Sequence, residues 1–423
     1  MKKIIFMLGV ITCLASESCT NEQYIDSDSK NLSNKVILEW NEVAYHAFGG
    51  EAYLHSLMAS RINAMTHIAM HDALNAVLPV YSTYAFQGND AGANPIAAAA
   101  SAAHIVLVHE IPEKVQFLDS ALQKTLSAIS DGDAKNRGIG LGKEAGQVII
   151  NARTNDGSVG NPMSPVPPSA GPGNYQAVPP FDILFAPYWV DLKPFGLQQK
   201  DQFRSTQHPS IQSVEYAEAF NEVKDAGKPD SNSRTEEQTA YSHFWYEFSE
   251  AGWNRVARTI ASDKKLGLHE TARLFALVDM AMADAYTAGW DSKFHYNLWR
   301  PYTAIRQAGI DYNEHTEEDL QWEPLMPTPP VQDYPSTHSA LGNAAATVMS
   351  KILGTNTSFS MSSPTALPSN GARSFTNVMQ AADENADSRV TAGIHFRFAC
   401  DAGQEMGNKI GQWMVDNYLK PLK

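Results

Sequence analysis

The chain has 423 residues, of which 43% are hydrophobic and 18% are charged, the balance of a globular protein. A chain of this length buries one large hydrophobic core or two ordinary ones. Its formal net charge of −14 excludes an extended nucleic-acid or polyanion surface, because such partners require a positive footprint. Any anion site must therefore be a local cationic pocket inside an acidic protein.

The N-terminus has the pattern of a bacterial export signal. Two lysines precede the apolar run 4–14, which is too short to span a bilayer, and small residues then lead to Cys19. We expect residues 1–19 to be the signal, with lipid attached at Cys19 and residues 20–35 forming a polar tether. Simple secretion is the alternative. Either way the protein is expected in the cell envelope, in the periplasm or as an outer-membrane lipoprotein.

Helical spacing dominates the rest of the chain. From about Trp40 onward, apolar residues recur on Ala-rich faces, and few segments alternate as strands do, so we predict an all-α fold. The earlier stretches with helical spacing are 61–77, 96–109, 116–129 and 140–153. The later ones are 214–226, 238–248, 271–289, 339–353, 374–385 and 403–418.

A connector separates the two helical regions. The stretch 157–195 holds nine prolines and must be irregular, yet aromatic residues are interleaved with them. This composition predicts a connector packed on the surface rather than a flexible linker. We therefore divide the chain into an N-terminal helical bundle over 36–156, a connector over 157–233, and a C-terminal bundle over 234–423 that carries the active site.

The two halves show signs of a duplication. Residues 64–76 match residues 276–288 at six of thirteen positions, and Arg61 falls on Arg273 at the same shift. Small residues and methionine on one stripe also suit close helix packing, so convergence is the alternative. We favour duplication, which predicts two stacked helical bundles of which only the second keeps the chemistry.

The first chemistry-bearing stretch contains two cations. Lys293 and Arg300 are seven residues apart, two helical turns, and Pro301 follows directly. We expect one helix to run as far as Trp299, so that both cations share a face before Pro301 ends it. A solvated basic edge is the alternative. Aromatic neighbours favour a partly buried face, where cations require an anion.

The second stretch, Pro335-Ser336-Thr337-His338, precedes an Ala-rich run that stops at Gly354. Ser336 or Thr337 is a natural N-cap, and His338 then falls in the first helical turn. An imidazole beside free helix amides is well placed to exchange a proton with a bound oxyanion. An ordinary capped helix with a surface histidine is the alternative.

The third stretch contains Ser388, Arg389 and His395. On one helix, Arg389 and His395 would point to different faces, so they converge only at a helix end or in a crevice. Gly393 between them permits a close approach of backbones. Taken together, the three stretches supply three cations, two imidazoles and a hydroxyl, a set that suits a tetrahedral oxoanion such as phosphate or vanadate.

These motifs resemble the vanadium-dependent haloperoxidases, which share a site with the type 2 phosphatidic-acid phosphatases and the bacterial acid phosphatases. The family pattern is Lys, six residues, Arg-Pro; then Pro-Ser-Gly-His; then Ser-Arg, five residues, His. The matching residues are Lys293, Arg300, Pro301, Pro335, Ser336, His338, Ser388, Arg389 and His395. Further likeness at 193–195, 202–204, 221–224, 244–245 and 252–254 indicates the long bacterial haloperoxidase-like branch.

The resemblance implies two stacked α-helical bundles and a vanadate cofactor. The residues implied to bind the oxoanion are Lys293, Arg300, Ser336, Thr337 (through its backbone amide) and Arg389. His395 would ligate vanadium, and His338 would be the general acid and base. Such an enzyme uses hydrogen peroxide to oxidise a halide to hypohalous acid, with vanadium remaining pentavalent and acting as a Lewis acid.

Two positions depart from the family pattern. Thr337 replaces the usual glycine and adds a β-branched side chain that we expect to narrow the pocket. Val331 stands where a chloride-oxidising member carries an aromatic residue. An acid phosphatase is therefore the alternative, with a phosphate ester as substrate, a phosphohistidine at His395 and no cofactor, because vanadate mimics the transition state of phosphoryl transfer. A non-catalytic envelope protein that binds phosphate or sulfate is a third reading.

Overall fold

The computed structural model describes residues 32–50 and 55–422. The predicted export signal, the lipidation site at Cys19 and most of the tether lie outside the described residues. Helices make up most of the described chain, with only two short two-stranded sheets, so the predicted all-α fold is confirmed. Within these described ranges, no helix combines the length and the apolar character needed to cross a membrane.

The first half of the chain forms a helical bundle. Its helices are α2 (Lys35–Ala47), α3 (Ser56–Val77), α4 (Pro95–Glu110), α5 (Val115–Ser127) and α6 (Asp133–Ala152). The backbones of α4 and α6 approach closely, because a Cβ atom at Gly142 would lie 2.2 Å from the Ala98 carbonyl oxygen. Small residues on both helices therefore set the tight packing of this bundle.

The connector is packed, as its composition predicts. It contains the antiparallel pair β1 (Met163–Pro165) and β2 (Ile183–Phe185), a short 3₁₀ turn over Pro187–Asp191, and α7 (Val214–Ala226). Tyr175, Trp189 and Phe195 are buried. These aromatic side chains attach an otherwise irregular segment to the helices beneath it.

The second half contains seven helices and a hairpin among the described residues. They are α8 (Glu236–Phe244), α9 (Ser249–Asp263), α10 (Leu268–Tyr296), α11 (Pro301–Arg306), α12 (Thr337–Leu353), β3 (Phe359–Ser362), β4 (Ala372–Phe375), α13 (Val378–Thr391) and α14 (Arg397–Asn417). Helical spacing over 238–248 predicted one helix through this range, but α8 ends at Phe244. The link 245–248 before α9 passes along the active site.

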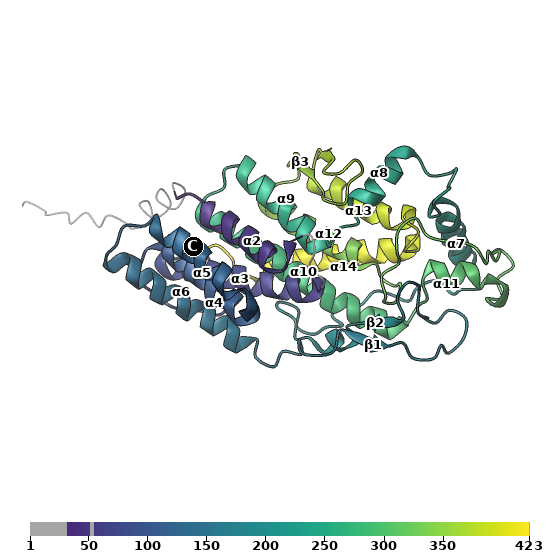
Figure 1. The fold of residues 1–423 in the computed structure, drawn as a ribbon, viewed down its shortest axis with the longest axis horizontal. Helices are drawn as coiled ribbons and strands as arrows, with labels where there is room; N and C mark the ends of the chain where they lie inside the picture. The colour runs from purple at the N-terminus through teal and green to yellow at the C-terminus, as the bar shows by residue number, and fades with distance from the viewer. Residues whose placement is uncertain (1–31, 51–54, 423) are drawn as a thin grey trace, which may run out of the picture.

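Helix α10 runs through the middle of the molecule and joins the two bundles (Figure 1). It packs against α3 of the first bundle and against α12 of the second. In Figure 1 the helices α4, α5 and α6 lie at one end of an elongated molecule, and α7 and α11 lie at the other. One continuous hydrophobic core extends through both bundles. The expected architecture of two stacked helical bundles is confirmed.

Two buried aspartates make the same kind of contact in the two halves. The Asp72 carboxylate on α3 accepts hydrogen bonds from the backbone amides of residues 84–86. The Asp284 carboxylate on α10 accepts hydrogen bonds from the backbone amides of residues 195–197. These aspartates coincide under the shift that aligns the two halves. The duplication stays a prediction, and this shared contact supports it.

Candidate active site

Lys293 and Arg300 belong to two different elements of the chain. Lys293 lies in the last turn of α10, which ends at Tyr296 because Asn297 adopts a left-handed conformation with φ of 50°. Arg300 is the residue before α11, whose first position is Pro301. The prediction of one helix as far as Trp299 is therefore wrong. Asparagine tolerates the left-handed region, and this turn separates the two cations.

One short segment nevertheless brings both cations together. The Lys293 Nζ atom donates hydrogen bonds to the carbonyl oxygens of Gln332 at 2.6 Å and Asp333 at 2.9 Å. The Arg300 Nε atom donates to the Val331 carbonyl oxygen at 2.7 Å. Both side chains are buried. Backbone carbonyls thus hold the two cations in place.

His395 lies directly against Arg300. The Arg300 Nη1 atom is 3.0 Å from His395 Nε2 and donates a hydrogen bond to the Ile394 carbonyl oxygen at 2.7 Å. Arg300 Nη1 is also 3.3 Å from His395 Nδ1. Asp333 Oδ1 is 2.9 Å from His395 Nδ1 and 3.7 Å from Arg300 Nη1, so a buried carboxylate lies beside the imidazole, as acidic groups do behind a ligating histidine.

The corner between α13 and α14 places His395 beside the cations. Helix α13 ends at Thr391 and α14 begins at Arg397, so Arg389 and His395 do not share a helix. Gly393 turns the chain with φ of 81°, and a Cβ atom there would lie 2.4 Å from the Gly227 carbonyl oxygen. The close backbone approach that Gly393 was expected to permit is confirmed. That Arg389 and His395 converge on one ligand stays a prediction.

Arg389 is the third buried cation. Its Nη1 atom donates a hydrogen bond to the Trp245 carbonyl oxygen at 3.0 Å, and its guanidinium carbon lies 5.6 Å from the centre of the Tyr246 ring. Its Nε atom is buried and has no hydrogen-bond partner within the described part of the chain. A buried donor without a partner is costly, so this atom points to an acceptor that the bound ligand supplies.

Ser336 caps α12 and can still donate a hydrogen bond. Its Oγ atom accepts from the Ser339 amide at 3.4 Å and from the Ser339 hydroxyl at 3.0 Å. Its own hydroxyl proton is therefore available to another acceptor. The predicted N-cap and the position of His338 in the first turn of this helix are confirmed.

The side chain of Thr337 packs against α10. A Cβ atom added to Gly289 would lie only 2.5 Å from Thr337 Cγ2. The methyl group that replaces the family's glycine therefore occupies space that Gly289 leaves open. The backbone amide of Thr337 remains at the helix N-terminus, where amides have no partner within the helix.

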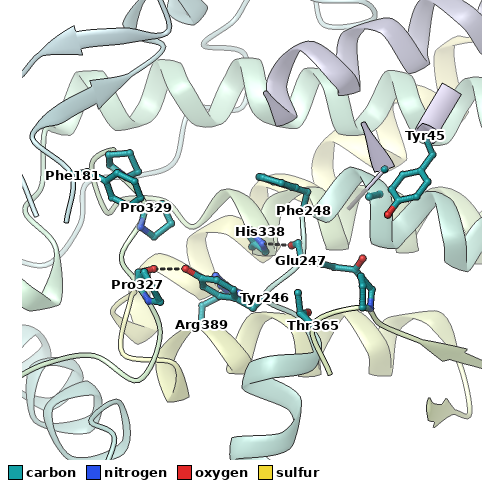
Figure 2. Close-up of a pocket in the computed structure, with 14 residues that line it drawn as sticks. Tyr45, Phe181, Tyr246, Glu247, Phe248, Pro327, Pro329, His338, Thr365 and Arg389 are labelled. Carbon is teal, nitrogen blue, oxygen red and sulfur yellow. Dashed lines mark hydrogen bonds between the residues drawn. The ribbon is translucent and has the colours of Figure 1, made fainter. Parts of the chain in front are cut away.

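His338 is held by one backbone carbonyl. Its Nε2 atom lies 3.0 Å from the Glu247 carbonyl oxygen (Figure 2). A carbonyl oxygen only accepts, so Nε2 must carry the hydrogen. Burial, reinforced by the charge of Arg389, holds the pKa of His338 well below its usual range. The ring is therefore neutral, and Nδ1 keeps the lone pair that can accept a proton.

Burial sets the charge state of the other groups. Burial and then the charges of Arg300 and Lys293 hold the pKa of His395 well below its usual range, so its imidazole is neutral and able to ligate. Burial also lowers the pKa of Lys293 well below its usual range and that of Arg389 to about 10. Burial raises the pKa of Asp333 to about 7, against the opposing effect of Arg300. A bound anion would stabilise the charged forms of all three cations.

A cavity of about 500 Å³ leads to this group of residues. His338 and Arg389 line it together with aromatic and proline side chains (Figure 2). The apolar wall residues are Tyr45, Phe181, Tyr246, Phe248, Pro327, Pro329, Pro330 and Pro364. Lys293, Arg300 and His395 are buried and do not line the cavity. The charges of Lys293 and Arg300 act on His338, which does line it.

The arrangement fits a tetrahedral oxoanion. The unpartnered Nε of Arg389, the free hydroxyl proton of Ser336 and the N-terminal amides of α12 are all donors. Lys293 and Arg300 add charge, and the neutral ring of His395 offers a ligating nitrogen. The residues present therefore suit vanadate or phosphate.

Comparison with known proteins identifies relatives of this site. The sequence profile of the VCPO second helical-bundle domain matches residues 273–423, which include every cation and imidazole described above. A bacterial vanadium-dependent iodoperoxidase superposes with a TM-score of 0.81 and 25% identity, covering 93% of this chain and 98% of that chain. The chain is similar to the vanadium haloperoxidases in fold and over residues 273–423. The family resemblance of its motifs is confirmed.

Two further vanadium haloperoxidases match over less of the chain. Vanadium chloroperoxidase of Curvularia inaequalis is 28% identical over 141 residues, which are 27% of this chain. The match spans only 22% of that protein. The holo-type bacterial vanadium-dependent chloroperoxidase superposes with a TM-score of 0.68 at 16% identity, over 87% of this chain and 93% of its own, which shows the shared fold.

Sequence patterns missed several residues that shape this vanadium haloperoxidase-like site. Asp333 lies within the stretch that was recognised, yet nothing in its spacing distinguishes it from a surface acid. Tyr246 and Glu247 fall within a region that helical spacing assigned to a helix interior. The only signal was the Phe244-Trp245 likeness to the bacterial branch.

Proposed function

We propose that this protein is a vanadate-dependent haloperoxidase that oxidises a halide with hydrogen peroxide. The observation that supports the proposal is a set of three buried cations whose charges act on two neutral imidazoles, with His338 and Arg389 lining one cavity. The relatives support it, because those of similar fold are named as vanadium-dependent iodoperoxidase and chloroperoxidase.

The site residues have two roles: most would bind the oxoanion, and His338 would transfer protons. Lys293, Arg300 and Arg389 would neutralise the oxygens, with Ser336 and the amide of Thr337 donating hydrogen bonds. His395 would bind the central vanadium atom through Nε2. The Arg300 Nη1 atom, which lies 3.0 Å from that nitrogen, would have to move away from it. Bound vanadate supplies a Lewis acid that activates hydrogen peroxide toward halide. Nδ1 of His338 accepts and returns the proton that this step moves.

The cavity suits small reactants. Its rigid aromatic and proline walls leave a path for a halide ion and for hydrogen peroxide toward His338 and Arg389. The same walls limit the water that reaches the buried cations, which strengthens their electrostatic effect. Small anions and peroxide are therefore the partners that we propose for this site.

An acid phosphatase is the second candidate. A neutral imidazole at His395 beside buried cations also suits attack on a phosphoryl group, and phosphate would then be part of the substrate. In that case no resident cofactor is needed. The two candidates use the same residues, so only a comparison of activities separates them.

The test compares two assays on purified protein. Protein incubated with orthovanadate is assayed for iodide- or bromide-dependent consumption of hydrogen peroxide, and vanadate-free protein for hydrolysis of p-nitrophenyl phosphate. We expect halide oxidation that requires vanadate and is lost in His395→Ala but kept in His315→Ala, a control on an exposed histidine whose side chain is 56% exposed. Hydrolysis that vanadate inhibits, without halide oxidation, would replace the first proposal by the second.

We also propose export to the cell envelope with a lipid on Cys19, from the sequence pattern alone. Residues 1–31 lie outside the described ranges, so the proposal rests on the charged and apolar pattern of the first nineteen residues. Metabolic labelling with palmitate should mark the wild-type protein and not Cys19→Ala. Equal labelling of both would contradict lipid attachment at this cysteine.

A further inference from the structure

Within the link 245–248 between α8 and α9, the backbone of residues 245–247 contacts two active-site side chains. The Trp245 carbonyl oxygen accepts from Arg389 Nη1 at 3.0 Å, and the Glu247 carbonyl oxygen lies 3.0 Å from His338 Nε2. The amides of Trp245 and Tyr246 donate hydrogen bonds back to carbonyl oxygens of α8. The position of Glu247 is set by side-chain contacts.

The side chains of residues 245–247 are each anchored at a different place. Trp245 Nε1 donates a hydrogen bond to Glu384 Oε1 at 2.9 Å. The Tyr246 hydroxyl donates to the Pro327 carbonyl oxygen at 2.7 Å, a bond drawn in Figure 2. Glu247 turns inward and receives two hydrogen bonds from Arg255, at 2.8 and 2.7 Å. The paired fork is the most directional of these anchors.

The Glu247 carboxylate is enclosed against the first turns of α9. The Glu247 side chain is 6% exposed, and that of Arg255 is 19% exposed. A Cβ atom at Gly252 would lie 3.0 Å from Glu247 Oε1, so the carboxylate rests on the bare backbone of this helix. Arg255 also donates to the Ser362 carbonyl oxygen at 3.0 Å, which ties the pair to β3. The carboxylate cannot shift without moving these contacts.

We propose that Glu247 is a positioning residue for His338. Its carboxylate, clamped by Arg255, fixes the carbonyl that holds the imidazole in one orientation and in the tautomer with hydrogen on Nε2. Asn385 Nδ2 donates to the His338 carbonyl oxygen at 2.9 Å, so the backbone of His338 is held independently of its ring. Loss of the clamp therefore frees the ring while leaving the helix in place.

The kinetic part of this inference rests on the proposed function, and the tautomer part does not. Removing a group that orients a catalytic side chain costs about 10- to 100-fold in activity. We expect Glu247→Gln and Arg255→Gln each to lower kcat by about that factor, with KM for halide and retention of vanadate unchanged. Because the two side chains act as one unit, the double variant should lose no more than either single variant.

The decisive readout is the ¹⁵N spectrum of histidine side chains in vanadate-free protein, with His338 assigned by its absence in His338→Ala. We expect wild-type protein to show the single Nε2-protonated tautomer, and both single variants to show averaged shifts. If the wild-type protein oxidises no halide, the spectrum still decides the inference. Arg255→Gln gives the same readout if Glu247→Gln fails to fold.

A matched control separates positioning from loss of stability. Asp156 is a buried carboxylate that receives hydrogen bonds from Arg61 and Arg153, outside the residues that line the cavity. Asp156→Asn should lower the melting temperature yet leave the His338 shifts and kcat at wild-type values. Wild-type shifts and wild-type kcat in Glu247→Gln would overturn the proposal, as would an equal loss of kcat in Asp156→Asn.

Discussion

A methyl group at position 289 should reveal where the Thr337 side chain points. In an unobstructed helix, replacing an interior glycine by alanine stabilises the folded protein by about 1 kcal/mol. At Gly289, however, the new Cβ atom would lie 2.5 Å from Thr337 Cγ2, well inside van der Waals contact. Overpacking of this kind costs about 1–3 kcal/mol, and the stiff χ1 angle of threonine limits escape. The net effect of Gly289→Ala is therefore a loss of up to about 2 kcal/mol.

The assay is a double-mutant cycle followed by urea unfolding and by melting temperature, where 1 kcal/mol corresponds to about 1 °C in a chain of this size. Combining Gly289→Ala with Thr337→Gly removes the collision, so the coupling energy should be about 1–3 kcal/mol in favour of the double variant. Gly140→Ala on α6 is the control, because a Cβ atom there meets nothing within 4 Å. If Gly289→Ala stabilises the protein as much as Gly140→Ala does, Thr337 does not pack against α10.

Three further outcomes follow from the site and the core. His395→Ala should abolish vanadate retention in equilibrium dialysis, and unchanged retention would remove His395 from the ligand role. His338→Ala should retain vanadate but lose about 100-fold or more in kcat, because it removes the proton-transfer group; full turnover would exclude that role. Burial raises the pKa of Asp284 from its ordinary value of 3.8 to about 6. The folded state then binds more protons than the unfolded state between these values, so stability falls by about 3 kcal/mol as pH rises through that window. Asp284→Asn should remove this fall in urea titrations at pH 4 to 7, and an unchanged slope would refute the assignment.

The helices and the charged motifs were predictable from sequence because each depends on local rules. Apolar periodicity located α7 at the bounds that the structure shows, and N-cap chemistry indicated Ser336 or Thr337 as the start of α12, where Ser336 is the cap. The seven-residue spacing of Lys293 and Arg300 did not predict that they lie in different elements. Asn297 ends α10 between them through a left-handed turn, which spacing cannot show. Their convergence comes instead from the carbonyls of residues 331–333.

The groups behind the active-site residues were not predictable in this way. Glu247 acts through its backbone, and a carbonyl leaves no trace in sequence. Glu247 and Arg255 are eight residues apart, a spacing at which helical side chains form no pair, so only the fold shows their contact. Asp333 is distinguished only by its place between Arg300 and His395, which depends on the corner at Gly393. Tertiary contact, rather than local propensity, assigns these residues to the site.

The most direct measurement is the position of vanadium in a crystal of the protein soaked with orthovanadate, read from anomalous scattering. We predict one strong peak adjacent to His395 and enclosed by Lys293, Arg300 and Arg389. A vanadium peak elsewhere, or an empty site at saturating orthovanadate, would contradict the claim that these cations and imidazoles form a single oxoanion site.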